Sequence, residues 1–406
     1  YFVKEYKGTK ILLDKKWESK EITITGQIPL LADMDGDCIP EFVIYGSASN
    51  YVPRPGLLDT TRILIIDSKT GSLKKKFDVI GFDDINSTAV LVDVDNDGIK
   101  EIIISVRSSQ IPYTGKLLCY DYNGKLRWFS NDYYFNLNYQ PGGPNLGVAD
   151  FNQDGVTEVY VNNRIFNART GVLLAEGGVN GMGSNLSTNV LTHQVSVAGQ
   201  LDNDPKDLEL AAGYSVYKVK IINKNGIIGN SMLASNIQVD GKYLDGKTAL
   251  ADINLDGRLD IIVSYLDYNT NSRLYVYTLI NNVPTLLTEN SLMGNYDSNG
   301  CPSIADIDGN GMLNILVSKN HLIHNFEYDG TSTLKLVWSF GVVDSAAYSS
   351  ITAFDLNGDG KKEIIYRGDT LLYIIDGSSA SPRIIDSKYC NATTLHENPV
   401  VGDIDN

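Results

Sequence analysis

The sequence predicts an all-β fold, a β-propeller of seven or eight four-stranded blades with an acidic loop between strands 1 and 2 of each blade. Two observations predict it. An acidic loop that leads into an apolar strand recurs along the whole chain, with successive copies starting 48 to 60 residues apart. Each period also contains several short apolar runs separated by turn residues, and no sustained helical periodicity. Four antiparallel strands in every repeat of this length are typical of a propeller.

The acidic loop occurs six times in full, as in "VDVDNDGIKEIIIS" and "ADINLDGRLDIIVS". Complete copies begin at Asp33, Asp93, Asp150, Asp252, Asp306 and Asp355, a degenerate copy begins at Gln200, and a truncated copy begins at Asp403. The regular spacing predicts one propeller domain over residues 1–406 rather than a series of separate domains. Because the last copy stops partway through the motif, we expect the chain to be a segment of a longer polypeptide.

The two ends of the chain also carry parts of the repeat. "EYKGTKILLDKKW" (5–17) resembles "EYDGTSTLKLVW" (327–338), which spans strand 3, a turn and strand 4 of its repeat. The closing residues "NPVVGDIDN" (398–406) read as a first strand followed by the start of a loop. A propeller must close its ring or leave sheet edges exposed. We therefore expect eight blades, the last one composite, or seven blades with extra end strands.

The spacing of oxygen-bearing residues in the loops suits calcium, which prefers six to eight oxygen ligands from a short loop. Positions 1, 3, 5 and 9 carry side-chain oxygens, position 7 varies and offers its backbone carbonyl, and position 6 is usually Gly, as a tight turn requires. The predicted metal ligands are Asp33, Asp35, Asp37, Ile39 and Glu41; Asp93, Asp95, Asp97, Ile99 and Glu101; Asp150, Asn152, Asp154, Val156 and Glu158; Asp252, Asn254, Asp256, Arg258 and Asp260; Asp306, Asp308, Asn310, Met312 and Asn314; and Asp355, Asn357, Asp359, Lys361 and Glu363.

The alternative is that Asp, Asn and Gly simply form good turns. A turn needs one or two such residues, whereas these six loops hold 19 of the 49 acidic residues of a chain whose net charge is −15. Clustered carboxylates repel one another unless a cation neutralises them. We therefore expect about six structural calcium ions. Carboxylate count together with glycine at the turn predicts that the Asp93 loop binds calcium first and the Asp306 loop late, and that the Gln200 loop is empty or distorted.

The "D-x-D/N-x-D-G-x-x-D/E" loop before an apolar strand resembles the FG-GAP/VCBS repeats of integrin-α-like propellers. The resemblance covers nearly the whole chain, and "ITAFDLNGDGKKEIIYRGDTLLYIIDG" is especially similar to repeats of secreted or surface-anchored bacterial proteins. It implies calcium-stabilised blades and a bacterial secreted or cell-surface location. The pattern fails at Gln200 and Pro205. Cys38 at the Gly position and Asn314 at the terminal acid position also depart from it.

No HExxH, G-x-S-x-G or Rossmann dinucleotide pattern occurs in the sequence, which favours a binding protein over an enzyme. The histidines (His193, His321, His324, His396) are scattered, and we expect them at surface or loop positions. The four cysteines are widely spaced and are expected to be free or partly buried thiols. Negative net charge disfavours nucleic acid as a partner, and no apolar run reaches the ~18 residues of a membrane span.

An aromatic-rich connector at residues 129–145 suggests where a partner binds. In a propeller this connector lies on the face opposite the metal loops, and Tyr133, Tyr134, Phe135 and Tyr139 there could stack on sugars or anchor a protein. We therefore predict a non-catalytic, calcium-binding extracellular module for adhesion, with a protein or glycan ligand. The alternative is a lectin or an enzyme acting on polysaccharide, because similar propellers include rhamnogalacturonan lyases.

Overall fold

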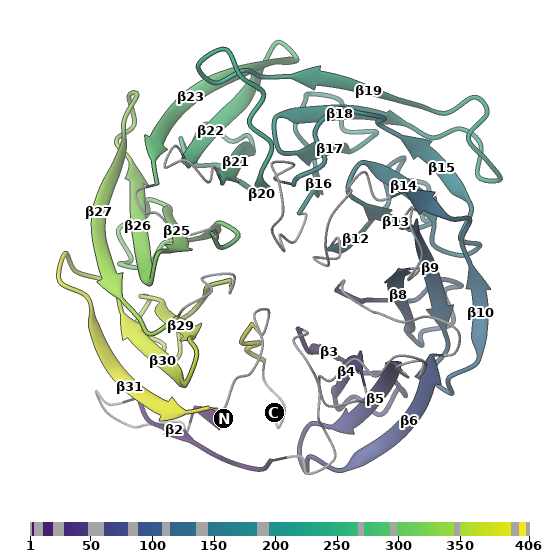
Figure 1. Cartoon of the computed structure of the whole chain (residues 1–406), viewed down its shortest axis with the longest axis horizontal. Coiled ribbons are helices and arrows are strands. Elements are labelled where there is room, and N and C mark those ends of the chain that lie inside the picture. Colours follow the sequence, from purple (N-terminus) through teal and green to yellow (C-terminus); the bar gives the residue numbers. More distant parts are fainter. Residues whose placement is uncertain are drawn as a thin grey trace, which may run out of the picture.

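The computed structural model shows a ring of seven antiparallel sheets arranged radially as the blades of a propeller (Figure 1). It describes residues 2–3, 11–18, 28–47, 61–79, 88–107, 114–134, 145–184, 195–266, 272–292, 299–344, 350–390 and 398–402. All regular elements in these ranges are strands, so the predicted all-β propeller is confirmed. No helix in these ranges is long and apolar enough to cross a membrane.

The first four blades follow one another along the chain. Blade 1 contains β3 (Leu30–Ala32), β4 (Glu41–Ser47), β5 (Thr61–Asp67) and β6 (Leu73–Val79). Blade 2 contains β7 (Val90–Val92), β8 (Glu101–Arg107), β9 (Thr114–Tyr120), β10 (Leu126–Phe129) and the short β11 (Tyr133–Tyr134). Blade 3 contains β12 (Leu146–Ala149), β13 (Glu158–Val161), β14 (Arg164–Asn167) and β15 (Leu173–Glu176), and blade 4 contains β16 (Val197–Gly199), β17 (Glu209–Ala212), β18 (Ser215–Lys220) and β19 (Ser231–Asn236).

The last three blades complete the series. Blade 5 contains β20 (Lys247–Ala251), β21 (Asp260–Tyr265), β22 (Arg273–Ile280) and β23 (Val283–Ser291). Blade 6 contains β24 (Ser303–Ala305), β25 (Asn314–Lys319), β26 (Leu322–Tyr328) and β27 (Leu334–Gly341). Blade 7 contains β28 (Thr352–Phe354), β29 (Glu363–Arg367), β30 (Leu371–Asp376) and β31 (Arg383–Tyr389). Each blade is a meander in which consecutive strands pair, except that β10 and β11 both pair with β9.

The hydrophobic core lies between the blades rather than inside any one of them. Strand 2 of a blade is covered on both faces, and every described side chain of β13, β17, β25 and β29 is buried. This explains why these strands read as continuous apolar runs instead of alternating ones. Six clusters of buried residues are each shared by two successive blades, such as Ile65 with Ile104 and Phe166 with Ile103, and a seventh joins the N-terminal segment to blade 7. Hydrophobic burial therefore holds successive blades together from blade 1 to blade 7.

A β-bulge interrupts the pairing of strands 3 and 4 in six of the seven blades. In blade 1, Ile66 pairs with Leu73 and Ile65 pairs with Lys75, so that Lys74 has no partner on β5. The bulged residues of the six blades are Lys74, Arg127, Leu174, Leu287, Val337 and Ile385. Blade 4 pairs β18 with β19 without a shift. Because a bulge re-aims one side chain out of the ladder, these positions are structurally equivalent and their residue types can be compared.

An aromatic ring on strand 4 covers the turn between strands 3 and 4 of the next blade. Phe77 lies against Gly124 and Trp128 lies against Gly171, so closely that an added Cβ would stand 2.5 Å from the ring in both cases. Trp338 approaches Gly377 in the same way, and its Nε1 donates a hydrogen bond to the Gly377 carbonyl. Only glycine fits at these positions, because the ring occupies the space that a side chain would need.

The two ends of the chain share the sector between blade 7 and blade 1, where Figure 1 places both termini. The short strands β1 (Phe2–Val3) and β2 (Leu13–Asp14) pair there, and Ile11 and Leu13 pack against Ile374 of blade 7. Trp17 covers Gly71 of blade 1 as Trp338 covers Gly377. This equivalence is what the resemblance between residues 5–17 and 327–338 predicts.

The C-terminal residues lie in the same sector. The Ser350 N–H donates to Oδ1 of Asn398 at 2.6 Å, and the Thr352 hydroxyl donates to the Pro399 carbonyl at 3.0 Å. The structure thus has seven blades, six of four strands and one with the additional short β11, and described residues of both chain ends lie in the sector between blades 7 and 1. Residues 403–406, which include the truncated loop copy, lie outside the described residues.

A buried carboxylate ties the connection between blades 3 and 4 to blade 5. Asp245, just before β20, accepts hydrogen bonds from the N–H groups of Met182 at 2.8 Å, Gly183 at 3.0 Å and Ser184 at 3.3 Å. Burial raises the pKa of Asp245 to about 7, although these N–H groups act in the opposite direction. The polar network therefore holds three blades together at the end of β20 opposite to its acidic loop.

The contact between rings and glycines can be tested by adding one methyl group. We expect Gly171→Ala to be destabilising because its Cβ would stand 2.5 Å from Trp128 and because φ is +73°. Gly330→Ala is the matched control, since Gly330 occupies a turn between strands 3 and 4 with φ +78° and open space around the Cβ. The control should cost about 1–2 kcal/mol from backbone strain, and Gly171→Ala roughly 1–3 kcal/mol more from overpacking. Urea unfolding would measure both, and equal losses would show that the ring contact is unimportant.

The raised pKa of Asp245 predicts a pH dependence of stability. Its folded-state pKa of about 7 lies above the ordinary value of 3.8, so its contribution to stability is complete below pH 3.8 and is lost as the pH rises through 7. Asp245→Asn, which does not titrate, lacks this loss. We expect the stability of the wild type relative to the variant to fall between pH 5 and pH 8 in urea titrations with chelator present. A constant difference would contradict the assignment.

Candidate metal-binding loops

The six complete loops share one hydrogen-bond framework. In each of them the position 1 carboxylate accepts the N–H of position 6, as Asp93 does from Gly98, at 2.7 to 2.9 Å. The side-chain oxygen of position 5 accepts the N–H of position 7, as Asp97 does from Ile99, at 2.6 to 3.0 Å. The predicted ligand residues at positions 1, 5 and 7 are therefore brought together within each loop.

Position 9 is the first residue of strand 2, and its side chain turns back under the loop. One oxygen accepts the N–H of position 2, as Glu158 does from Phe151, at 2.8 to 3.1 Å in all six loops. These side chains are 0 to 5% exposed. The neighbouring apolar strand explains the burial, because position 9 begins the segment that two blades enclose.

The loop backbone turns through the left-handed region twice. Position 6 has φ between +82° and +89° where it is glycine, and Cys38 adopts +65° at this position in the first loop. Position 4 is also left-handed, with non-glycine examples at Asn96, Gln153 and Leu255. The sequence predicted the first of these requirements but not the second. The backbone reverses so tightly because every loop must present several N–H groups to the position 1 carboxylate.

The electrostatics of the loops differ between their outer and buried acids. The N–H groups of Gly360 and Gly358 lower the pKa of Asp355 and outweigh the effect of burial, so this outer carboxylate stays charged. Burial raises the pKa of Glu158 to about 7, against the Phe151 N–H, and the charges of Asp150 and Asp154 raise it further. A buried carboxylate with acidic neighbours needs a cation if it is to remain ionised.

Several buried loop oxygens accept no hydrogen bond within the described part of the chain. They include Oε1 of Glu158 at position 9, and Oδ1 of Asp35, Asp95 and Asn152 at position 3. An orphaned buried oxygen costs free energy unless a donor or a metal ion meets it. Carboxylate, amide and carbonyl oxygens are hard ligands that suit calcium. The loop residues thus fit the metal that the sequence predicts.

Close groups of three acidic side chains occur in three loops among the described residues. Ligand atoms lie within 4.8 Å of one another for Asp33, Asp35 and Asp37, for Asp93, Asp95 and Glu101, and for Asp202, Asp207 and Glu209. In the Asp150, Asp252 and Asp355 loops, Asn at position 3 replaces one acid. In the Asp306 loop, Asn310 and Asn314 replace two acids.

The degenerate loop at Gln200 keeps the turn by different hydrogen bonds. Gln200 Nε2 donates to the carbonyls of Asp202 at 3.0 Å and Asp204 at 2.8 Å, whereas the first Asp of the other loops accepts from N–H groups. Leu201 donates to Glu209, eight residues away, so this loop is one residue longer than the others. The Lys218 ammonium binds Oδ2 of Asp202 at 2.9 Å. The framework is therefore rearranged, as the sequence suggested.

Basic side chains at the loops were missed by the sequence reasoning. Lys74 and Arg127 form ion pairs with acids of the Asp33 and Asp93 loops, and Lys224 pairs with Asp154 at 2.7 Å. A sequence signal for the first two does exist. Lys74 and Arg127 each follow the turn glycine, Gly71 or Gly124, by three residues in the pattern G-x-L-K/R. The pattern places the basic residue at the acidic loop only because of the β-bulge, and residue propensities do not predict a bulge.

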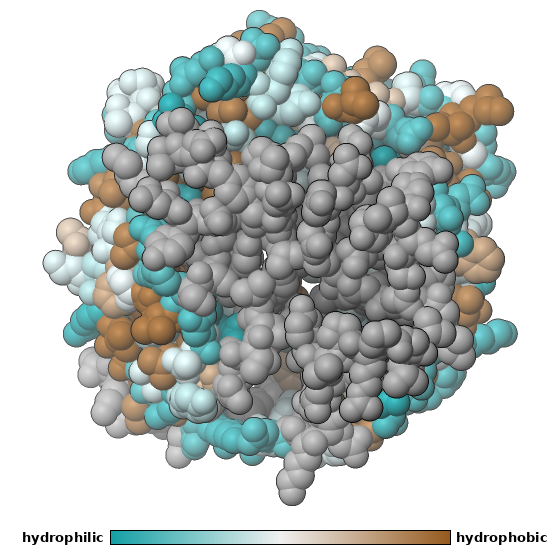
Figure 2. Space-filling model, viewed as in Figure 1, coloured by the Kyte–Doolittle hydropathy of each residue, from teal (hydrophilic) through white to brown (hydrophobic). Residues whose placement is uncertain are grey.

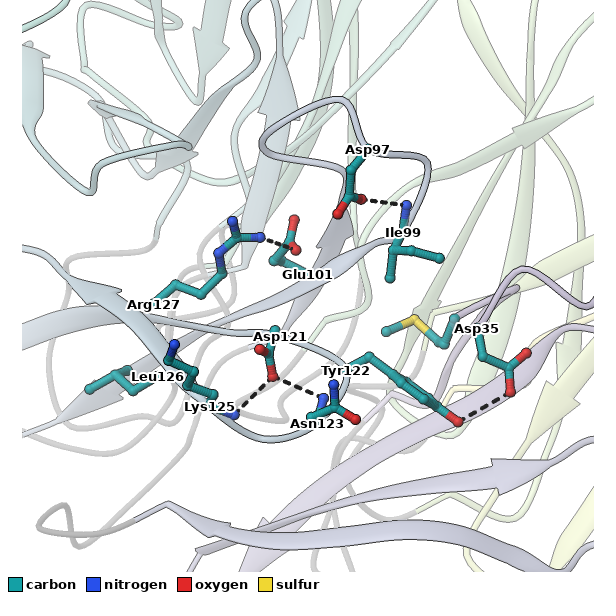
Figure 3. Close-up of a pocket in the computed structure, with 11 residues that line it drawn as sticks. Asp35, Asp97, Ile99, Glu101, Asp121, Tyr122, Asn123, Lys125, Leu126 and Arg127 are labelled. Atoms are coloured by element: carbon teal, nitrogen blue, oxygen red, sulfur yellow. Dashed lines mark hydrogen bonds and ion pairs between the residues drawn. The ribbon is translucent and has the colours of Figure 1, made fainter.

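A pocket of ≈ 600 Å³ lies between the loops of blades 1 and 2 (Figure 3). Its wall is formed by Met34, Asp35, Asp97, Ile99, Glu101, Asp121, Tyr122, Asn123, Lys125, Leu126 and Arg127. The Tyr122 hydroxyl donates to Asp35 at 3.1 Å, and Arg127 binds Glu101. Many of its charged groups therefore already have partners, and the cavity presents a mixed polar and apolar wall.

In the described residues, the aromatic connector does not form the predicted ligand-binding surface. Tyr133 is buried, its hydroxyl lies 2.5 Å from that of Ser105, and its ring packs 5.9 Å from Phe166. It pairs with β9 as a core residue and cannot stack on a ligand. Tyr134 belongs to β11, and Phe135 and Tyr139 lie outside the described residues.

The expected positions of the histidines are wrong in one case, whereas the expectation for the cysteines is confirmed. His324 is buried in β26 with Nδ1 2.8 Å from the Ser339 hydroxyl, so the expectation of a surface or loop position is wrong for it. His193 and His396 lie outside the described residues. All four cysteines are free thiols, as predicted, and Cys119 is buried.

Exposed apolar residues are scattered where Figure 2 shows described residues. On that face, the described hydrophobic residues lie at the periphery among hydrophilic ones. Single exposed apolar residues are normal on protein surfaces. The loops and the pocket between blades 1 and 2 are therefore the best-defined candidate sites in the described part of the chain.

Solved structures similar to this chain share its fold at low sequence identity. The crystal structure of the V. cholerae biofilm matrix protein Bap1 has a TM-score of 0.58 and 13% identity, and the match covers 96% of this chain and 85% of that chain. The Bacillus licheniformis rhamnogalacturonan lyase PL11 has a TM-score of 0.52 and 16% identity, and the match covers 92% of this chain and 62% of that chain. No curated protein sequence matches significantly.

The repeats themselves match a family model. The FG-GAP-like repeat model matches residues 93–161, 252–317 and 306–366. These ranges begin at the first acid of the Asp93, Asp252 and Asp306 loops, and they run through the strands that follow. The sequence resemblance is thus confirmed for these segments, and the chain is a seven-bladed β-propeller built with FG-GAP-like repeats.

Proposed function

We propose that this chain is a non-catalytic, calcium-stabilised propeller module that acts outside a bacterial cell in adhesion or ligand binding. The observation that carries the proposal is the set of buried loop oxygens without hydrogen-bond donors, led by Oε1 of Glu158. They lie in loops that also offer outer carboxylates, side-chain amides and a position 7 carbonyl. Calcium accepts such flexible sets of oxygens, whereas magnesium requires a near-ideal octahedron and keeps several waters.

The calcium ion has a structural role in this proposal. The residues at positions 1 and 5 hold the loop backbone, and position 9 joins the loop to the buried start of strand 2. An ion bound among them links the inner strand to strand 2 and neutralises a buried negative charge. Because the loops repeat around the ring, each ion stabilises its own blade and the contacts of that blade with the next.

Two observations support an extracellular binding module. FG-GAP-like repeats and a fold shared with a biofilm matrix protein are consistent with a location outside the cell. The pocket between blades 1 and 2 offers amide, carboxylate and guanidinium groups next to the apolar side chains of Ile99 and Leu126. Sugars are recognised by such combinations of hydrogen-bonding groups and apolar surface.

The alternative is an enzyme acting on polysaccharide, because a rhamnogalacturonan lyase shares the fold. General acid–base catalysis requires a group that can take up and release a proton at the substrate. In the pocket, Asp35 and Glu101 are engaged by Lys74, Tyr122 and Arg127. This arrangement favours binding over catalysis. Glycan-array binding with and without calcium, combined with an assay for unsaturated products from pectic polysaccharides, separates the two functions.

Calcium should raise the stability of the folded chain. An ion that binds only the folded form contributes about 2.7 kcal/mol per site at a concentration 100-fold above Kd. We therefore expect a higher melting temperature in calcium than in chelator, and a smaller rise in magnesium. Glu158→Gln, which removes one buried carboxylate charge, should reduce the difference. Identical melting curves in calcium and chelator would rule out structural calcium.

A further inference from the structure

The bulged residue of strand 4 lies beside the acidic loop of its own blade and differs between blades. It is basic in blades 1 and 2, where it is Lys74 or Arg127, and aliphatic in blades 3, 5, 6 and 7. The bulge is the same in all six blades, so only the residue type changes. The position therefore separates the loops into two groups.

In blade 1 the ammonium group of Lys74 sits among the predicted calcium ligands. Nζ lies 3.1 Å from Asp35, 3.3 Å from Asp37 and 2.6 Å from Glu41. These residues occupy positions 3, 5 and 9 of the loop. Glu41 is fully buried, and its other oxygen accepts the Met34 N–H. Lys74 thus completes the bonding of the buried acid and neutralises its charge.

In blade 2 the guanidinium group of Arg127 plays the same part. Its two terminal nitrogens bind Asp95 and Glu101, at positions 3 and 9 of the loop. Figure 3 shows Arg127 extending from its strand toward Glu101. Glu101 is buried, and its remaining oxygen accepts the Val94 N–H. The Asp93 loop, which combines carboxylates at positions 1, 3, 5 and 9 with a glycine turn, thus already contains a cation.

Blade 3 shows the arrangement when the bulged residue is not basic. Leu174 is the bulged residue and is fully buried. Oε1 of Glu158, at position 9, is buried and accepts no hydrogen bond within the described part of the chain, because the basic residue of this loop, Lys224, pairs with Asp154 at position 5 instead. In blade 5 the bulged residue is Leu287, and the side-chain partner of Asp260 at position 9 is the Thr278 hydroxyl instead of a basic residue.

We propose that Lys74 and Arg127 are built-in cations that replace the divalent ion in the first two loops. Calcium then binds the loops whose bulged residue is aliphatic, led by the Asp150 and Asp252 loops. The reason is electrostatic, because a divalent ion among the same carboxylates would lie within a few ångströms of a fixed positive charge and be repelled. This inference rests on the proposed calcium binding, and it reverses the order that carboxylate count alone predicts.

The test exchanges the bulged residues between the two groups. Lys74→Leu and Arg127→Leu give blades 1 and 2 the residue of blade 3, and Leu174→Lys gives blade 3 the residue of blade 1. Lys76→Leu and Lys125→Leu are matched controls, since both remove an exposed charge from the same strand or its turn. Leu287→Lys repeats the reverse exchange in blade 5 in case Leu174→Lys does not fold.

Calcium stoichiometry, measured by equilibrium dialysis and calorimetry on the whole chain, is the main readout. The wild type should bind no more than four ions, at the Asp150, Asp252, Asp306 and Asp355 loops. Lys74→Leu and Arg127→Leu should each bind one more, melt at a lower temperature than the wild type in chelator, and recover in calcium. Leu174→Lys or Leu287→Lys should bind one ion fewer. The two controls should match the wild type.

The outcomes distinguish this inference from the proposed function. Six ions in the wild type, or unchanged stoichiometry in folded Lys74→Leu and Arg127→Leu variants, would overturn the built-in cations while leaving calcium binding intact. Calcium binding by these variants but not by the wild type would support the built-in cations and overturn structural calcium in the natural chain. No binding by any variant would overturn both.

Discussion

Each blade depends on a carboxylate or amide that is buried where strand 2 begins. Its first oxygen holds the N–H of position 2, and this bond fixes the path by which the chain leaves the inner strand. The same side chain lies between two blades, where water cannot solvate it. The molecule stabilises this position in different ways. A basic side chain meets Glu41 and Glu101, the Asn357 amide meets Glu363, and position 9 of the Asp306 loop is the uncharged Asn314.

The repeats made the fold predictable. A single acidic loop could be an ordinary turn, whereas six copies at regular spacing indicate a repeat architecture. The ends of the chain were also readable, since the match between residues 5–17 and 327–338 anticipated that Trp17 and Trp338 cover equivalent glycines. Positions 1, 5 and 9 were readable for the same reason. Their hydrogen bonds are local and therefore repeat whenever the residues repeat.

What the sequence did not reveal depends on contacts between strands. Lys74 reads as an ordinary residue on a polar outer strand, and only the shift of pairing at Ile65 and Ile66 turns it toward the loop. Tyr133 was misassigned for a related reason. An aromatic residue in a long connector looks exposed, but the pairing of β11 with β9 carries its ring into the core. Register is set by tertiary structure, and a single sequence carries little information about it.

Blade 4 indicates that the loop and the bulge form one unit. It is the blade with a rearranged loop, and its outer strand pairs with β18 in regular register. Its basic residue comes from strand 3 instead, where Lys218 reaches Asp202. The blade that has lost the loop motif has thus also lost the bulge that faces this loop in the other six blades.

The sector shared by the two chain ends closes the ring in a different way from the seven blades. A blade is held by the pairing of consecutive strands. Among the described residues, the shared sector instead combines the short pair of β1 and β2, the side-chain packing of Ile11, Leu13 and Trp17, and hydrogen bonds such as those to residues 398–399. Contacts between residues far apart in the chain carry the largest loop-closure entropy, so this sector is the entropically costliest part of the ring to close.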